Sequence, residues 1–247
     1  MRQCFDLHTH TTFSDGKNAP EEMILEAISR GFKVIGFSDH SPVAFDPPGG
    51  MPEGMQLAYR QAVRKLEEKY RSLITVRLGL EQDFYSGPFE ENAYDYIIGS
   101  VHYLKCADTF VAVDNTPELF MKGAETFFGG DYIKMAGYYF ETVAQVPEKN
   151  HCDIIGHFDL FSKFNEKYHF FDEQDPVYIR AWQQACDHLL TYDVAFEINT
   201  GAMYRGWRST PYPSPDILKY LKERGARLIY ASDSHVTDQL GYGFPEE

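Results

Sequence analysis

Short apolar segments rich in β-branched residues alternate along the chain with longer segments of helical periodicity. The short segments predict buried strands. There are seven of them: Cys4–Leu7, Lys33–Phe37, Ile74–Leu80, Tyr94–Gly99, Asp153–Gly156, Val194–Ile198 and Arg227–Ala231.

The longer segments predict helices, and the first of them is the clearest. Asn18–Arg30 has Pro20 near its start, apolar residues at helical spacing and Gly31 directly after its end, which are typical helix boundaries. Similar patterns predict helices over Glu53–Arg71, Pro117–Gln145 with a break at Gly129 and Gly130, Asp175–Leu190 and Pro215–Arg224.

Strands that alternate with helices predict a parallel sheet joined by right-handed crossovers. About seven repeats in 247 residues favour an α/β fold closed into a TIM-like barrel, with an open doubly wound sheet as the alternative. No linker divides the sequence, so we expect a single domain over residues 1–247. The longest interruption, Tyr103–Asn150, is expected to cover the barrel mouth.

Side chains able to bind metal follow nearly every predicted strand. In a parallel barrel the carboxyl ends of all strands meet at one face, so these residues are expected to lie together. The candidate ligands are His8, His10, Asp15, His40, Glu81, His102, His157, Asp233 and His235. Four further carboxylates could be ligands or could orient a ligating histidine: Asp39, Asp83, Asp159 and Glu197. Three histidines that follow no strand are read as structural: His151, His169 and His188.

The ligand types indicate which metals to expect. His8 and His10 are two residues apart, which places both imidazoles on the same side of an extended chain. Imidazole combined with carboxylate is typical of Zn, Mn or Fe sites. The cluster exceeds what one catalytic ion requires, so we expect two or three divalent transition metal ions. Neighbouring ions of this kind suit phosphoester hydrolysis.

Composition and charge limit the classes of binding partner and the cellular location that we expect. Hydrophobic residues make up 43% of the chain and charged residues 24%, as in soluble globular proteins. A net charge of −14 argues against nucleic acid as a partner. No apolar run suits a membrane span or a signal peptide, and the four cysteines form no CxxC pair, so we expect a cytoplasmic protein. The sequence leaves the oligomeric state open.

The motifs resemble those of the PHP (polymerase and histidinol phosphatase) superfamily. Four motifs carry the resemblance: Asp6-Leu7-His8-Thr9-His10, Ser38-Asp39-His40, Gly99-Ser100-Val101-His102 and Asp233-Ser234-His235. The stretch His8–Gly16, together with Gly79-Leu80-Glu81, Gly156–Leu160 and Glu197–Thr200, resembles the histidinol-phosphatase branch more than the polymerase domains. The likeness spans nearly the whole chain.

The resemblance implies a distorted (β/α)7 TIM-like barrel with a trinuclear metal site. One ion would be held by His8, His10, Glu81 and Asp233. A second would share Glu81 with His102 and His157, and the third would be held by Asp15, His40 and His235. Asp15 stands where other branches have histidine, which is expected to lower affinity for the third ion.

Basic side chains that grip phosphate are also implied by the resemblance. The candidates are Arg205, Arg208 and Lys163, because a guanidinium can hold phosphate bidentately. The alternative for the two arginines is that they are solvated loop charges. An arginine is expected near Ser162, where this chain has none.

The expected function is hydrolysis of a small phosphorylated substrate, L-histidinol phosphate, to histidinol and phosphate in histidine biosynthesis. Metal-bound hydroxide would attack phosphorus, Arg205 would clamp the phosphate, and Asp233 or His235 would move the proton. One rival is a PHP enzyme for another small phosphate ester or a phosphotyrosine protein. The other is a metal-binding barrel with a structural or regulatory role.

Overall fold

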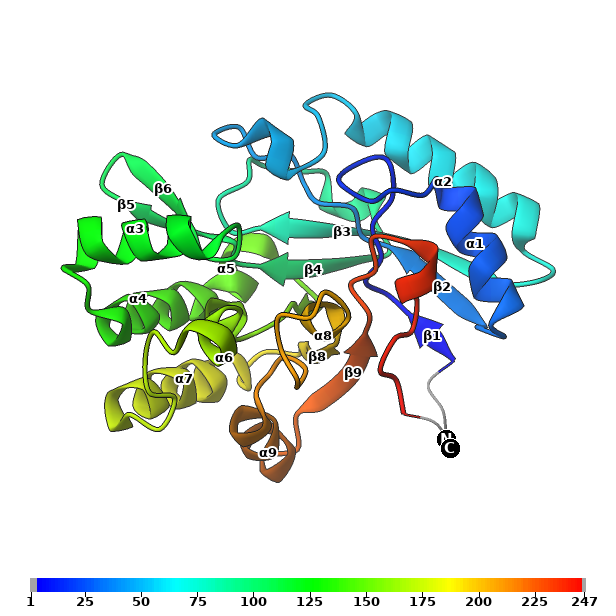
Figure 1. Ribbon diagram of the computed structural model, residues 1–247. Helices are drawn as coiled ribbons and strands as arrows, with labels where there is room; N and C mark the ends of the chain where they lie inside the picture. The colour runs from blue at the N-terminus through cyan, green and yellow to red at the C-terminus, as the bar shows by residue number, and fades with distance from the viewer. Residues whose placement is uncertain (1–3, 246–247) are drawn as a thin grey trace.

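The computed structural model describes residues 4–245, and in that part of the chain seven parallel strands form one sheet. The strands are β1 (Phe5–Asp6), β2 (Val34–Phe37), β3 (Thr75–Asp83), β4 (Tyr96–Ser100), β7 (Ile154–Ile155), β8 (Ala195–Asn199) and β9 (Arg227–Ala231). They lie side by side in chain order, as successive β/α units require. The sheet curls into a nearly closed, distorted (β/α)7 barrel (Figure 1), which confirms the predicted fold class.

The barrel closes at the carboxyl ends of its first and last strands. Thr9, just beyond β1, forms a parallel bridge with Ser234, just beyond β9. The His10 N–H donates to the Ser234 carbonyl at 2.8 Å. Further down the seam, the Ser232 hydroxyl donates to the buried carboxylate of Asp6 at 2.5 Å. The two edges therefore meet at the face where the candidate ligands lie.

The longer helices fall inside the predicted ranges and pack around the sheet. They are α1 (Pro20–Ser29), α2 (Gln56–Tyr70), α3 (Pro117–Phe128), α4 (Tyr132–Ala144), α7 (Pro176–Leu189) and α9 (Pro215–Glu223). In α1 the side chains of Met23 and Ile24 are fully buried, and burial of such a side chain contributes roughly 1.5–3 kcal/mol. None of the helices in residues 4–245 is long and apolar enough to cross a membrane.

Shorter helical elements, which the sequence patterns do not predict, join the larger ones. They are α5 (Val146–Asn150), α6 (Asn165–Tyr168), α8 (Gly201–Tyr204) and four 3-10 turns, η1 (Pro47–Gly49), η2 (Glu91–Ala93), η3 (Leu160–Ser162) and η4 (Thr237–Gln239).

The segment expected to cover the barrel mouth does so only at its start. Residues from Tyr103 form an antiparallel hairpin that the sequence did not predict, made of β5 (Tyr103–Cys106) and β6 (Thr109–Ala112). The hairpin lies beyond the carboxyl ends of β3 and β4 (Figure 1). The rest of the segment, α3 to α5, builds the side of the molecule, where α4 packs against α7.

We expect Ser232→Ala to weaken the seam of the barrel. Burial raises the pKa of Asp6 to about 6, and the hydrogen bond from Ser232 opposes that rise. Removing the hydroxyl leaves a buried carboxylate short of a donor, so the free energy of unfolding should fall by about 1–3 kcal/mol. Urea unfolding of the metal-free protein at mildly alkaline pH measures it. Ser209→Ala, at an exposed position, is the control, and equal stability of the two variants would contradict the prediction.

Candidate metal centre

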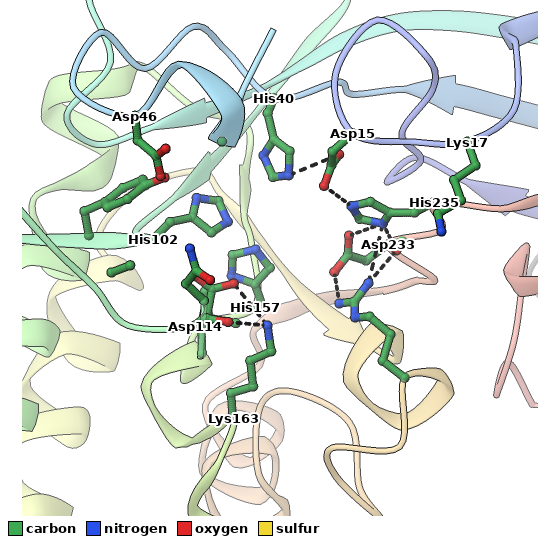
Figure 2. A pocket seen from close by; sticks show the side chains of 16 residues that line it. Asp15, Lys17, His40, Asp46, His102, Asp114, His157, Lys163, Asp233 and His235 are labelled. Carbon is green, nitrogen blue, oxygen red and sulfur yellow. Dashed lines mark hydrogen bonds and ion pairs between the residues drawn. The ribbon is translucent and has the colours of Figure 1, made fainter. Parts of the chain in front are cut away.

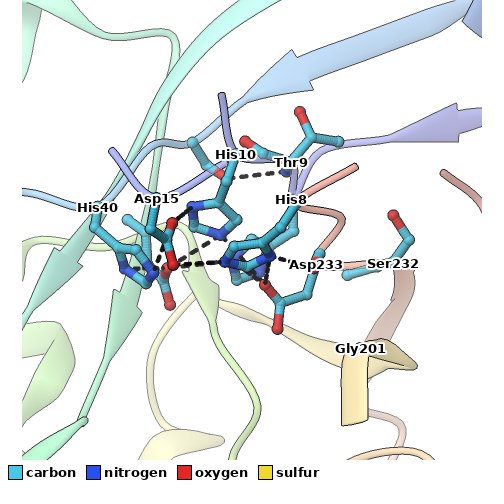
Figure 3. Close-up of polar contacts among 12 residues, drawn as sticks. His8, Thr9, His10, Asp15, His40, Gly201, Ser232 and Asp233 are labelled. Atoms are coloured by element: carbon cyan, nitrogen blue, oxygen red, sulfur yellow. Dashed lines mark hydrogen bonds and ion pairs between the residues drawn. The ribbon is translucent and has the colours of Figure 1, made fainter. Parts of the chain in front are cut away.

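The segment after β1 directs two histidines into the barrel mouth. The rings of His8 and His10 lie 5.0 Å apart, while the Thr9 hydroxyl between them donates to the Gly36 carbonyl at 2.7 Å. Figure 3 shows both rings on one side of the chain, facing Asp233. The spacing of two residues therefore has the geometric result expected from an extended backbone.

Glu81, on β3, is the centre of the cluster. Its side chain is fully buried. One carboxylate oxygen, Oε1, accepts a hydrogen bond from the Ser100 hydroxyl at 2.6 Å and lies 2.9 Å from His157 Nε2 and 3.4 Å from His102 Nε2. The other oxygen, Oε2, lies 2.8 Å from His40 Nδ1. A carboxylate shared between imidazoles on both sides suits a ligand that bridges two ions.

The candidate ligands fall into three overlapping groups whose ligand atoms lie within 4.8 Å of one another. The groups are His10, Asp15, His40 and His235; His8, His10 and Asp233; and His40, Glu81 and His102. His157 joins them through its contact with Glu81. All nine candidates thus meet at one mouth. Their grouping differs from the one that the family resemblance implies, because His10 also lies beside Asp15, and His40 beside Glu81.

Buried nitrogen and oxygen atoms of this cluster lie close together without hydrogen bonds, which is the observation that fits a metal. Among the described residues, His8 Nε2, His10 Nε2 and Glu81 Oε2 make no hydrogen bond although all three are buried. Buried polar atoms are rarely left unpaired in proteins. His8 Nε2 and His10 Nε2 lie 3.3 and 3.5 Å from Glu81 Oε2. Such nitrogen and oxygen donors are those of Zn, Mn and Fe sites.

Electrostatics keep the two central carboxylates ionised. Burial works against the charge on Glu81, but the neighbouring His40 and His8 hold its pKa well below the ordinary value. Asp233 is also buried, and the Arg205 guanidinium and His8 hold its pKa well below the ordinary value. Burial, together with His235 and His40, lowers the pKa of His10 to about 3. His10 is therefore neutral, the form of imidazole that binds metal.

Two of the four carboxylates whose role the sequence left undecided contact candidate ligands. Glu197 Oε1 lies 2.6 Å from His8 Nδ1, and Asp83 Oδ2 lies 3.3 Å from His102 Nδ1. Neither carboxylate belongs to the three groups. Each engages the ring nitrogen that faces away from Glu81, which fixes the orientation of the imidazole.

The other two carboxylates brace loops. Asp39 accepts hydrogen bonds from the Thr11 N–H at 2.8 Å and from the Ser14 hydroxyl at 2.7 Å, and so shapes the loop that carries Asp15. Asp159 accepts from the Ser214 N–H at 2.9 Å.

A pocket of about 420 Å³ lies over the candidate ligands, and Arg205 is one of the basic residues that line it. Lys163 and Lys17 are the other two (Figure 2). Arg205 Nη2 donates to Asp233 Oδ2 at 2.9 Å. Lys163 Nζ donates to the carbonyl of Asp114 at 2.6 Å. Sequence reasoning missed Lys17, although it directly follows the motif that ends at Gly16.

Arg208 is not brought into this pocket, contrary to its expected place there. Its side chain is buried, lies over the Tyr212 ring at 4.8 Å and donates to the Ser162 hydroxyl. The buried carboxylate of Asp159, 4.0 Å away, attracts the guanidinium inward. Arg208 is thus not a solvated loop charge. Its guanidinium lies beside Ser162, in the loop where the family resemblance led us to expect an arginine.

The acidic wall of the pocket was also missed. Asp46, Tyr103 and Asp114 line it, and the Tyr103 hydroxyl donates to Asp46 Oδ2 at 2.7 Å. None of the three directly follows a predicted barrel strand, so the positional rule that found the ligands could not find them. The histidines read as structural lie outside both the pocket and the three ligand groups: His151, His169 and His188.

Comparison with known proteins decides the family. The sequence model of the family described as "PHP domain" matches residues 6–201. The chain belongs to the PHP domain family. Within the family it falls in the histidinol-phosphatase-like branch, as its motifs predicted.

Relatives cover this chain almost end to end. A protein of Deinococcus radiodurans named "Probable histidinol-phosphatase" is 31% identical over 98% of this chain and 90% of its own length. One of Schizosaccharomyces pombe with the same name is 29% identical over 91% of this chain and 77% of its own. By this similarity the PHP domain is a phosphatase of the phosphoric monoester hydrolase class.

Solved structures share the fold of this PHP domain. A candidate histidinol phosphatase of Listeria monocytogenes superposes with a TM-score of 0.85 at 23% identity, covering 97% of this chain and 98% of that one. The histidinol phosphate phosphatase of Lactococcus lactis, solved with zinc, L-histidinol and phosphate, superposes with a TM-score of 0.71 at 21% identity, covering 95% and 87%.

We expect Glu81→Gln to remove bound metal and with it turnover. The neutral amide offers one oxygen in place of a bridging anion, so activity should fall by more than about 100-fold and elemental analysis should find fewer ions per chain. Circular dichroism should be unchanged. Glu118→Gln, exposed on α3, is the matched control. Full metal content in Glu81→Gln would rule out a bridging role.

Proposed function

We propose that this PHP domain hydrolyses L-histidinol phosphate to L-histidinol and phosphate, a step of histidine biosynthesis. The observation that carries the proposal is the ionised, buried Glu81 among five imidazoles, three of which (His40, His102 and His157) line a pocket whose wall also holds Arg205 and Lys163. The names of the relatives from Deinococcus radiodurans and Schizosaccharomyces pombe support the choice of substrate.

Two or three divalent transition metal ions complete the proposed site. We assign as ligands the residues that converge on the mouth: His8, His10, Asp15, His40, Glu81, His102, His157, Asp233 and His235. When bound, such ions supply a hydroxide nucleophile near neutral pH and offset charge on the phosphoryl oxygens. Glu197 and Asp83 keep His8 and His102 turned toward the ions.

Arg205 is the proposed phosphate clamp. The Asp233 carboxylate holds its guanidinium at the pocket wall, 3.5 Å from His235 Nδ1. From there its N–H groups can bind two phosphoryl oxygens in a bidentate contact. Lys163 adds a second positive charge from the loop after β7. Arg208 has no part in this contact, because its guanidinium is buried beside Ser162.

The departing histidinol oxygen needs a proton, and two residues at the pocket could move it. Asp233 is held ionised by Arg205 and His8, which makes it a poor donor. His235 lines the same pocket, with Nε2 3.0 Å from Asp15 Oδ2. We therefore assign donation to His235 in molecules whose third ion site is empty, because an imidazole that binds an ion has lost the proton it would give, and leave Asp233 as the anion that positions Arg205.

The acidic wall suits a cationic leaving group. Histidinol carries an ammonium group and an imidazole, and a neutral aryl alcohol carries neither. Asp46 and Asp114 lie in the wall of the pocket and are not among the grouped metal ligands. Partial burial works against the charge on Asp114, but Lys163 holds the pKa of this half-buried carboxyl below its ordinary value, so it is charged. Asp46, which has no basic partner among the described ion pairs, is the better placed to attract the ammonium group.

The deciding experiment measures phosphate release from L-histidinol phosphate and from a generic aryl phosphate by protein whose metals have been counted. A strong preference for histidinol phosphate with two or three ions per chain is the expected result. Preference for another ester would keep the metal centre and the chemistry but remove the substrate. Loaded protein inert on a broad panel of esters would favour a structural or regulatory role.

We expect Asp46→Asn to weaken selection of histidinol phosphate specifically. Loss of one charge opposite the ammonium group should raise its KM roughly tenfold, equivalent to about 1.4 kcal/mol, with little change for the aryl phosphate. Asp108→Asn, in the β5–β6 turn and outside the pocket wall, controls for charge in general. An equal loss on both substrates would show that Asp46 only holds Tyr103 in place.

A further inference from the structure

Gln239, which belongs to no ligand group, holds the backbone of the turn that carries Asp233 and His235. Its side chain is buried, 1% exposed. The amide Nε2 donates to the carbonyls of Ser232 and Asp233, at 2.9 and 2.8 Å. Its Oε1 accepts from the His235 N–H at 3.1 Å. One side chain thus makes all three of these backbone hydrogen bonds.

The turn needs such support because its backbone is unusual. Asp233 has a φ of 50°, in the left-handed region that an aspartate adopts at an energetic cost. Residues held in this region persist only where the surroundings fix them. The conformation brings Asp233 Oδ1 to 3.2 Å from His10 Nε2 and leaves Oδ2 for Arg205. An extended Asp233 would aim its carboxylate elsewhere.

The same turn anchors the loop that carries Asp15. The Lys17 N–H donates to the His235 carbonyl at 2.8 Å, and the Thr237 N–H donates to Asn18 Oδ1 at 3.1 Å. His235 Nε2 in turn lies 3.0 Å from Asp15 Oδ2. A shift of the turn would therefore move Asp15 as well as the two ligands within it.

We propose that Gln239 is a positioning residue of the metal centre, which fixes the left-handed turn at Asp233 and so aims three of the proposed ligands, Asp233, His235 and Asp15. The inference rests on the proposed metal-dependent function. It concerns metal affinity and ligand geometry, which can be measured without any substrate.

The test replaces Gln239 by Met, which has similar volume and no hydrogen-bonding amide, and by Glu, which keeps an acceptor for the His235 N–H but loses the donor. Affinity for Zn²⁺ is measured by competition with a chelator, and the visible spectrum of the Co²⁺-loaded protein reports ligand geometry. We expect roughly tenfold weaker binding of at least one ion and an altered Co²⁺ spectrum in both variants. With substrate, kcat should fall more than KM rises.

Asn165→Leu is the matched control. Asn165 is also a buried amide that bridges backbone groups, since it accepts from the Phe171 N–H and donates to the Phe171 carbonyl, both at 3.1 Å, away from the ligands. It should lose thermal stability in the metal-free state but keep wild-type Zn²⁺ affinity and Co²⁺ spectrum.

Wild-type affinity and spectrum in folded Gln239→Met, or losses no larger than those of Asn165→Leu, would overturn the proposal. If the Met variant fails to fold, the same readouts on Gln239→Glu decide. Wild-type protein that takes up no ion would overturn the metal centre itself, and the role of Gln239 with it. Wild-type protein that binds ions tightly but ignores histidinol phosphate would remove only the substrate.

Discussion

The structure depends on one buried carboxylate that must stay charged. Glu81 lies out of reach of water, where an isolated anion is strongly unfavourable, and the surrounding imidazoles, the Ser100 hydroxyl and the cations proposed to bind there offset that cost. Its two oxygens face different histidines, so no single partner can satisfy it. To place these histidines around Glu81, strands far apart in the sequence must end at the same face of the barrel.

Around this carboxylate, further side chains hold the proposed ligands in position. The proposed ligands are held by residues outside the three ligand groups: Glu197 beside His8, Asp83 beside His102, and Gln239 beside the backbone of the last turn. The geometry of the site therefore depends on hydrogen bonds from carboxylate and amide side chains that are not themselves proposed ligands. The pocket above adds charge of both signs, basic at Arg205 and acidic at Asp46, which gives an ester two distinguishable ends to present.

The sequence predicted the barrel and the convergence of nine candidate ligands because both follow from a positional rule, that the strand ends of a parallel barrel share a face. The same rule does not predict pocket residues that are positioned by loops. Asp46 and Tyr103 reach the pocket from an irregular turn and from a hairpin, and nothing in their local pattern indicates that they meet. Arg208 was misplaced for a related reason: a guanidinium after a strand end can turn toward the pocket or toward a buried acid, and only the packing around Asp159 decides. The roles of Glu197 and Asp83 needed distances, since spacing alone cannot separate a ligand from its supporting carboxylate.

Closure of the barrel would link the stability of the fold to metal binding. The bridge between Thr9 and Ser234 joins the two ends of the chain at the point where His8, His10 and His235 come together. An ion bound there would act as a staple across the seam, tying the first strand to the last. Any species that binds only the folded state stabilises it, by an amount that grows with the logarithm of its concentration once that exceeds Kd. The free energy of unfolding would then depend on the supply of transition metal, and loss of the ion would loosen the barrel at its seam.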